Sequence, residues 1–139
     1  MQMHPYLNFK GQCEAAFKLY ERCLDGQLGE IFRYAGTSLA DQVPADWQDK
    51  VMHGSVTVGG QELMGADVAP DRYEPLKGFS LSIQIEDTAE AERIFRELSH
   101  AGSMVMPLEK TFWAERFGMV IDRFGIPWMI NCEASGQPA

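Results

Sequence analysis

The side chain best suited to chemistry near neutral pH is His53, which opens the stretch HGSVTVGG. Alternation along this stretch places His53, Ser55 and Thr57 on one side of an expected strand, opposite Val56 and Val58. A neutral imidazole on an accessible face can bind a ligand or move a proton. The alternative is a strand-end histidine bonded to a neighbouring backbone group. The catalytic residue is therefore unknown from the sequence, and His53 is the best candidate.

A second set of reactive side chains lies in EKTFWAERFGMVIDRFGIPWMINCE, residues 109–133. We predict that Glu109, Trp113, Glu115 and Arg116 form a loop before a strand. In that loop a tryptophan offers an apolar plate and an arginine a planar clamp for an anion. The alternative role for Arg116 is an ion pair with Glu109 or Glu115.

The strand that ends this stretch has two different faces. Trp128 and Ile130 share the face expected to pack in the core, so Met129 and Asn131 should face the opposite way. The strand is thus predicted to close a core on one side, while the loop before it could line a site on the other.

These residues need elements to position them, and the chain repeats one pattern of elements twice. Residues 5–9 indicate a strand, and GQCEAAFKLYERCLDG indicates a helix that ends at Gly26. FSLSIQI alternates as a half-buried strand should, and DTAEAERIFRELSHAG indicates a helix that ends at Gly102. The predicted buried positions are Cys13, Ala16, Phe17, Tyr20 and Leu24 in the first helix and Ala91, Ile94, Phe95 and Leu98 in the second.

Turn and cap residues support the same repeat. Asp87 and Glu90 have the spacing of a capping box at the start of the second helix. Gly59-Gly60 and Phe124-Gly125 mark two hairpin turns between strands. Residues 33–50 and 68–78 are rich in Gly, Pro and Asp and are predicted to be surface segments. Each half therefore reads as a strand, a helix and an antiparallel set, which indicates an α+β fold.

The charge of the chain excludes some partners. A net charge of −8 and a pI near 4.8 give the wrong sign for binding to nucleic acid or to an anionic membrane, and a neutral or cationic small ligand fits better. No apolar run approaches the length of a membrane span, and the N-terminus lacks the pattern of a signal peptide. Cys13, Cys23 and Cys132 are too widely spaced for a zinc motif and indicate reduced, structural thiols. We therefore expect a cytoplasmic protein.

Three stretches carry a resemblance to a known family: PYLNFKGQCEAAFKLY, VMHGSVTVGGQELMGAD and PLEKTFWAERFGMVIDRFGIPWMINCE. Together they resemble the PhnB-like branch of the vicinal oxygen chelate superfamily, which includes glyoxalases, bleomycin-resistance proteins and extradiol dioxygenases. The resemblance covers nearly the whole chain. It implies a single domain, residues 1–139, made of two βαβββ modules at about 1–68 and about 78–134. It also implies a U-shaped, incompletely closed mixed β-barrel with the helices packed outside, and a homodimer.

Some relatives have been labelled demethylubiquinone methyltransferases, and we do not extend that label to this chain. A nucleotide-like methyl donor would be expected to bind at a glycine-rich turn between a strand and a helix. TVGGQELMG reads instead as a hairpin followed by a strand.

Enzymes of the superfamily hold a divalent metal with four ligands, and the resemblance places the corresponding positions at His4, Met64, Ser80 and Met129. Only His4 is a good ligand, because a thioether or a neutral hydroxyl binds a divalent ion poorly. We therefore predict no metal and no other cofactor. The alternative is a divalent metal held by His4 and His53 with a further partner such as Glu62 or Asp67.

Two functions remain open. The first is a small-molecule binding protein that lacks the usual metal site. The second is a metal-dependent lyase, isomerase or dioxygenase acting on vicinal oxygens, with His53 as ligand or base. The predicted ligand-binding residues are His4, Tyr6, Asn8, His53, Ser55, Thr57, Trp113, Arg116, Met129 and Asn131, with Ser82 on the same concave surface.

Overall fold

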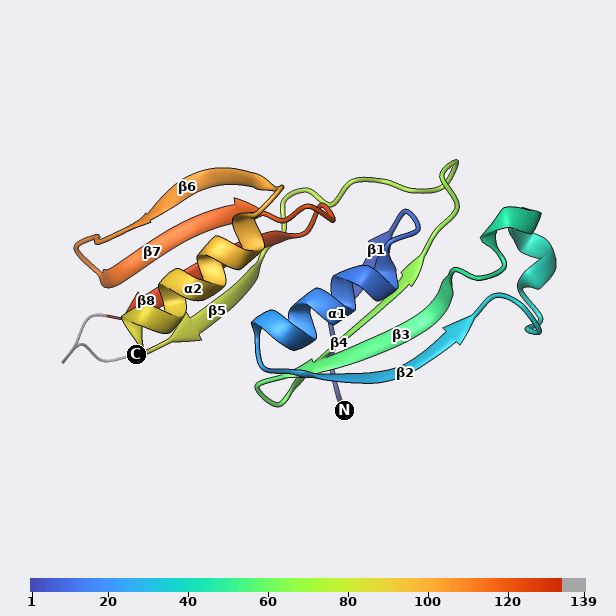
Figure 1. The fold of residues 1–139 in the computed structure, drawn as a ribbon, viewed down its shortest axis with the longest axis horizontal. Coiled ribbons are helices and arrows are strands. Elements are labelled where there is room, and N and C mark those ends of the chain that lie inside the picture. The colour runs from blue at the N-terminus through green and yellow to red at the C-terminus, as the bar shows by residue number, and fades with distance from the viewer. Residues whose placement is uncertain (134–139) are drawn as a thin grey trace. The chain divides into compact units, whose positions relative to one another are not determined.

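The computed structural model describes residues 1–133, which form two βαβββ modules (Figure 1). The chain divides into a unit of Met1–Glu74 and a second unit that begins at Pro75. Ala134, the last residue predicted for the second module, lies outside the described residues. The α+β class and the two-module organisation predicted from the sequence are confirmed.

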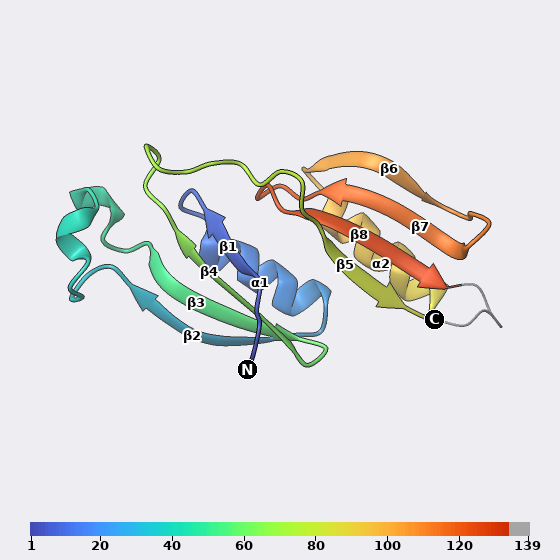
Figure 2. The same cartoon turned by 180° about the vertical axis from the view of Figure 1, so that it is seen from behind.

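The first unit is a four-stranded mixed sheet with one helix. Its elements are β1 (Tyr6–Phe9), α1 (Cys13–Cys23), β2 (Gln27–Arg33), β3 (Val51–Val58) and β4 (Gln61–Asp67). The strand order is β1-β4-β3-β2, with β1 parallel to β4 and the other pairs antiparallel. Helix α1 lies over one face of this sheet (Figure 1), and the view from behind shows the other face without a helix (Figure 2).

The second unit repeats this arrangement. Its elements are β5 (Leu81–Ile85), α2 (Thr88–Ser99), β6 (Ser103–Glu109), β7 (Ala114–Ile121) and β8 (Pro127–Glu133). The strand order is β5-β8-β7-β6, with β5 parallel to β8. The parallel pair at one edge and the antiparallel strands beyond it match the pairing in the first unit.

Each helix buries one stripe of side chains against its own sheet. In the first unit Phe9 and Phe17 pack edge to face with ring centroids 5.7 Å apart, above buried Val51 and Val56. In the second unit all four predicted helix positions, Ala91, Ile94, Phe95 and Leu98, are buried. All three cysteines are free and buried, which agrees with their predicted structural role. No helix within residues 1–133 is long and apolar enough to cross a membrane.

A buried aspartate joins four segments of the first unit. One carboxylate oxygen of Asp67 accepts from the backbone N–H groups of Gly11 and Cys13, at 3.0 and 2.8 Å, and the other accepts from Val51 N–H at 2.9 Å. Its backbone carbonyl accepts from the Tyr34 hydroxyl at 2.6 Å. Asp67 thus ties the end of β4 to the start of α1, the start of β3 and the segment after β2.

Both helices end differently from the prediction. The residues in the left-handed region are Asp25 (φ 52°) and Ala101 (φ 59°), not the glycines that follow them. A Cβ added to Gly26 would meet the Thr57 carbonyl at 2.7 Å, and one added to Gly102 would meet the Ile121 carbonyl at 2.4 Å. These glycines are therefore required by the close approach of a strand, and the helices end three residues before them, at Cys23 and Ser99.

Three other local predictions concern the cap of α2, the Gly59-Gly60 hairpin and the segment 33–50. The Asp87 side chain caps α2 by accepting from Ala89 N–H at 3.0 Å, as predicted, but Glu90 pairs with Arg93 at 2.7 Å. Gly59 and Gly60 both have positive φ, which confirms the hairpin between β3 and β4. Residues 33–50 contain the short 3-10 helices η1 (Ala40–Gln42) and η2 (Ala45–Trp47).

The loop predicted over residues 109–116 is much shorter in the structure. β6 continues to Glu109 and β7 begins at Ala114, so Glu115 and Arg116 are strand residues. The sequence conceals β6 because its side chains, including Met104, Val105 and Met106, are exposed on an edge strand whose register shifts twice. Exposure on both faces removes the alternation by which a strand is recognised.

The Asp67 contacts lead to a stability prediction. Replacing Asp67 with Asn removes one of the two acceptor oxygens and directs an NH2 group at a buried backbone N–H. We expect a loss of roughly 2–4 kcal/mol in the free energy of unfolding, measured by chemical denaturation. The exposed Asp71 is the matched control, and Asp71→Asn should change this value by less than about 0.5 kcal/mol. Equal effects of the two changes would contradict the assigned role of Asp67.

Candidate functional site

The helix-free face of the first sheet carries those side chains of the first unit that were predicted to bind a ligand. Alternation on β1, β3 and β4 turns the core residues toward α1 and the intervening residues away from it. We call the second group the first-sheet face, and it contains Tyr6, Asn8, Phe32, His53, Ser55, Thr57 and Met64. The structure thus brings together five of the predicted ligand-binding residues, two from β1 and three from β3, as the sequence predicted for His53, Ser55 and Thr57.

His53 lies in a row of aromatic rings on this face. Its Nδ1 is 3.2 Å from the Tyr6 hydroxyl, and the two ring centroids are 5.7 Å apart. On its other side Phe32, its register partner on β2, lies 6.5 Å away between centroids. The imidazole is therefore bonded to a side chain, not to the backbone group considered as the alternative. When the Tyr6 hydroxyl donates, Nε2 carries the ring proton.

The two flanking rings are accessible. Tyr6 and Phe32 are 50% and 47% exposed, which is unusual for large apolar surfaces placed side by side. Partial burial, followed by the charges of Cys13 and Tyr34, raises the pKa of Tyr6, so its hydroxyl stays neutral and can donate a proton in a hydrogen bond. The row Tyr6–His53–Phe32 offers flat apolar surface with a polar centre.

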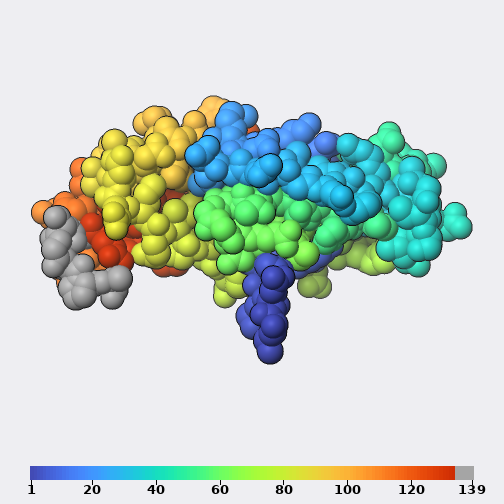
Figure 3. Space-filling model, turned by 90° about the horizontal axis from the view of Figure 1, so that it is seen from below, coloured from blue at the N-terminus to red at the C-terminus, as the bar shows by residue number. Residues whose placement is uncertain are grey.

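His4 belongs to a different part of this face. It lies in the N-terminal segment that projects from the first unit, dark blue in Figure 3. Its Nε2 is 3.6 Å from a Glu62 carboxylate oxygen and 3.3 Å from the Gln2 side-chain oxygen, while Nδ1 is buried without a partner. His4 therefore has one carboxylate neighbour of the kind that accompanies a metal ligand.

The donor set does not fit the superfamily's metal. His4 lies beside Glu62 of β4. His53 precedes Gly54, which pairs with Gly65, and so it lies opposite Ala66, four residues farther along β4. At about 3.3 Å per residue the backbone positions of the two histidines are roughly 13 Å apart along β4, too far to favour sharing an ion that holds nitrogen at about 2 Å. Asp67 is turned toward α1 and bonded to backbone N–H groups. Within residues 1–133 no three His, Cys, Asp or Glu side chains are grouped to hold a metal.

The helix-free face of the second sheet carries a short polar chain. Gln84 donates to the Ser82 hydroxyl at 2.9 Å, and the Asn131 amide donates to Gln84 at 2.7 Å. This direction of donation leaves Asn131 Oδ1 buried without a partner. Met129 lies next to Asn131 on the same face and is paired with Ser82. Asn131 and Met129 thus share a face, as the sequence predicted.

Beside this chain the face becomes apolar. Trp113 packs on Phe117 with centroids 5.5 Å apart, and Phe117 is the register partner of Asn131. A cavity of about 550 Å³ opens near Met129 within the second unit, and Phe79, Val105, Met119 and Trp128 contribute to its walls. This volume lies in the range of small-molecule sites. This cavity was not predicted, because its walls combine Phe79, at the start of one predicted strand, with Val105 of β6, which has no recognisable pattern.

Arg116 lies apart from these side chains. Its Nε donates to the Glu92 carboxylate of α2 at 3.1 Å, and Nη1 donates to the backbone carbonyl of Glu115 at 2.7 Å. The predicted partners Glu109 and Glu115 are not its carboxylate partners. A salt bridge to a helix residue 24 positions earlier has no local signal in the sequence, which explains the error.

The family follows from comparison with known proteins. A family model described as 3-demethylubiquinone-9 3-methyltransferase matches residues 1–131. The chain belongs to this family. It is 35% identical over 140 residues to Protein YjdN of Escherichia coli K12, with 94% of this chain and 95% of that protein covered.

Solved structures of other members agree with this assignment. Protein PA1353 of Pseudomonas aeruginosa is 46% identical, with 96% and 98% of the two chains covered and a TM-score of 0.85. A putative 3-demethylubiquinone-9 3-methyltransferase, PhnB protein, of Bacillus cereus is 25% identical, with 95% and 99% covered and a TM-score of 0.83. The PhnB-like resemblance is thereby confirmed.

A more distant neighbour supports the fold alone. A glyoxylase/bleomycin resistance protein/dioxygenase domain of Frankia is 12% identical, with 96% and 98% of the two chains covered and a TM-score of 0.64. Members of the family therefore share the fold of the vicinal oxygen chelate superfamily.

The family's description names a methyltransferase, but neither helix begins with the glycine-rich turn that would bind a nucleotide-like methyl donor. TVGGQELMG is a hairpin between β3 and β4, as predicted. The turn into α1 contains one glycine, and its Gly11 and Cys13 N–H groups are already bound by Asp67. The turn into α2 contains none. A nucleotide-like methyl donor would need such N–H groups free.

The donor set leads to a prediction about metal content. Protein purified without chelator should contain divalent metal far below one ion per chain, because His4 and Glu62 supply two donors at most. Elemental analysis measures this directly. His4→Ala should leave the value unchanged. A stoichiometric metal that is lost in His4→Ala would contradict the prediction and favour the metal-dependent enzyme.

Proposed function

We propose that this protein binds a small, largely apolar molecule on the helix-free faces of its sheets and needs no metal to do so. The observation that carries this proposal is the row Tyr6–His53–Phe32, in which two accessible rings flank an imidazole. A planar ligand can stack on these rings and exchange a hydrogen bond with His53 or Asn8. The second sheet supports the proposal with its apolar cavity and with Met129 and Asn131 beside it.

The charge of the chain favours a neutral or cationic ligand. The net charge is −8, and Glu62 adds an acidic group to the first-sheet face beside His4. An anion would meet an unfavourable field there. The three buried, free thiols are consistent with a reducing compartment, and we propose the cytoplasm.

We also propose that the protein forms a homodimer through the second unit. The turn between β6 and β7, residues 110–113, exposes Phe112 by 89% and Trp113 by 43%. The segment before β5 exposes Phe79 by 48%. Apolar surface of this kind is more often covered by a partner than left in water.

Replacing His53 tests the ligand site. His53→Ala should weaken the best planar compound from a thermal-shift screen by about tenfold, while unfolding free energy changes by no more than about 1 kcal/mol, because the side chain is partly exposed. Tyr6→Phe keeps the ring and should weaken binding less. His100→Ala, at the exposed end of α2, is the control and should have no effect. A large loss of stability with unchanged affinity would overturn the site.

The dimer is tested by light scattering after size exclusion at micromolar concentration. The expected mass is twice the chain mass of 15.6 kDa. Phe112→Asp should shift the mass toward the monomer because it places a charge in the apolar contact. Met3→Asp, equally exposed but in the N-terminal segment, should not. A monomeric wild-type protein would rule out the dimer.

A further inference from the structure

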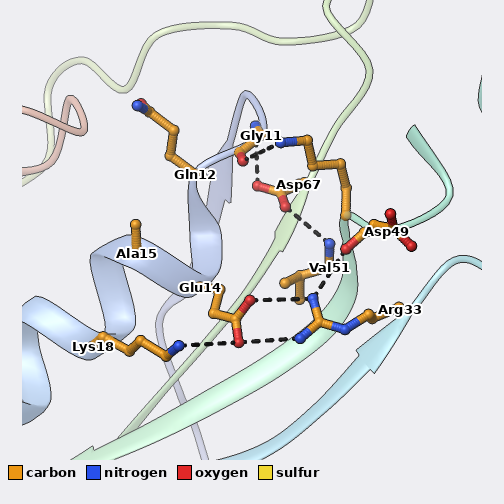
Figure 4. Close-up of a pocket in the computed structure, with 10 residues that line it drawn as sticks. Gly11, Gln12, Glu14, Ala15, Lys18, Arg33, Asp49, Val51 and Asp67 are labelled. Atoms are coloured by element: carbon orange, nitrogen blue, oxygen red, sulfur yellow. Dashed lines mark hydrogen bonds and ion pairs between the residues drawn. The ribbon is translucent and has the colours of Figure 1, made fainter. Parts of the chain in front are cut away.

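A cavity of about 310 Å³ lies on the opposite side of the first sheet from His53, between α1 and the ends of β2, β3 and β4 (Figure 4). Its walls include side chains from three separate segments: Glu14 and Lys18 of α1, Arg33 at the end of β2 and Lys50 just before β3. The cavity is thus distinct from the helix-free faces to which the proposed function is assigned.

Three cationic side chains converge on this cavity. Arg33 donates to both Glu14 carboxylate oxygens, at 3.2 and 3.1 Å, and the Lys18 ammonium is 3.5 Å from the same carboxylate. Lys50 reaches across to donate to the Gly11 carbonyl at 3.1 Å and lies over the Trp47 ring. Each lysine ammonium has donors left over after these contacts, since it carries three N–H groups.

The acidic groups around the cavity balance these charges only in part. Asp67 is buried beneath it, with both oxygens bound to backbone N–H groups. Asp49 contributes its backbone carbonyl, which accepts from Arg33 at 3.0 Å, while its carboxylate is directed away from the Glu14–Arg33 pair (Figure 4). Glu14 is bound directly to the cations, and the exposed Asp49 carboxylate adds a second negative charge that acts on Arg33, so the accessible groups that line the cavity carry an excess of one positive charge.

This local charge is opposite to that of the whole chain, which has 12 basic and 20 acidic residues. An exposed ion pair by itself contributes little to the stability of the fold. Stability therefore does not require these cations to lie close together. Their convergence on a concave site is what separates this cluster from an ordinary solvated surface. Interaction with Arg33 lowers the pKa of Glu14, so the carboxylate remains charged and occupies the guanidinium as an anion would.

We propose that this cavity binds a phosphate group, free or as a small phosphate monoester. A phosphate anion is attracted by the excess positive charge and can accept from Lys18, Lys50 and a rotated Arg33 at once. The Gly11 and Cys13 N–H groups at the start of α1 take no part, because Asp67 already binds them. The volume accommodates a phosphate with a few further atoms.

Calorimetric titration with inorganic phosphate at low ionic strength tests the proposal. Lys18→Gln should weaken phosphate about tenfold, and Lys50→Gln should do the same. Lys110→Gln makes the same charge change in the second unit and should leave the affinity unchanged. Because Lys18 is 60% exposed, its variant keeps the fold even if Lys50→Gln does not.

The variant Glu14→Gln distinguishes a phosphate site from a purely structural ion pair by its affinity for phosphate. It frees Arg33 from a competing carboxylate, so phosphate should bind several-fold more tightly, although the variant loses a salt bridge. Affinity for a phosphate monoester should also fall as the pH drops through about 6, where the monoester dianion is protonated. Titration with glycerol 3-phosphate distinguishes the sources: tighter ester binding indicates a metabolite, and tighter free phosphate indicates the inorganic ion.

The proposal is overturned by the absence of saturable phosphate binding, or by a loss of affinity in Lys110→Gln equal to that in Lys18→Gln. The first result would show that the cavity holds no anion, and the second that phosphate responds only to overall charge. Both outcomes leave the His53 site untouched, since that site is tested with a different compound.

Discussion

The first unit depends on one buried carboxylate. Asp67 lies at the end of β4, and its two oxygens bind N–H groups from the turn into α1 and from the start of β3. Each of these N–H groups would otherwise be buried without an acceptor, because it lies where a helix or a strand begins and has no regular partner. The helix is therefore held over the sheet at a fixed end, and the core formed by Phe9 and Phe17 packs beneath it. The second unit uses a buried aspartate differently: Asp122 accepts from Phe124 and Ile126 N–H within the β7–β8 turn and from Trp128 Nε1.

Fixing the helix side of the sheet determines what the other side can present. Successive residues of a strand point to opposite faces, so the burial of Gly54 and Val56 sets the direction of His53 and Ser55. Val51 is buried whereas His53 reaches Tyr6 across the helix-free face, because the β2–β3 register shifts between the Phe32↔His53 and Arg33↔Val51 pairs and interrupts the alternation there. The same strand thus borders the cationic cavity at its start and carries the imidazole two residues later. The polar side chains of the first-sheet face are therefore held in place by apolar contacts on the opposite face, which packs against α1.

The sequence predicted those parts of the fold that depend on local periodicity. The alternation in β5, the hairpin at Gly59-Gly60 and the buried stripe of α2 follow from residue order alone and are confirmed. What could not be predicted depends on contacts between distant segments. Gly26 and Gly102 serve close approaches to Thr57 and Ile121, and so Asp25 and Ala101 take the left-handed conformation in their place. Edge strand β6 lacks a buried face, and Arg116 finds Glu92 on a helix.

The candidate site shows the same division. Alternation along β3 and β8 correctly predicted the faces on which His53, Met129 and Asn131 lie. It did not predict which side chains of other strands lie beside them. Phe32 joins His53 only through the register of β2 and β3, which shifts at a bulge just beyond that pair. Glu62 joins His4 because a parallel strand brings positions 58 apart in the chain side by side. The distance between the two histidines then follows from the register, since each is fixed to a different end of β4. A pattern of residue types can thus nominate donors, whereas the register of the sheet decides which of them can act on the same ligand.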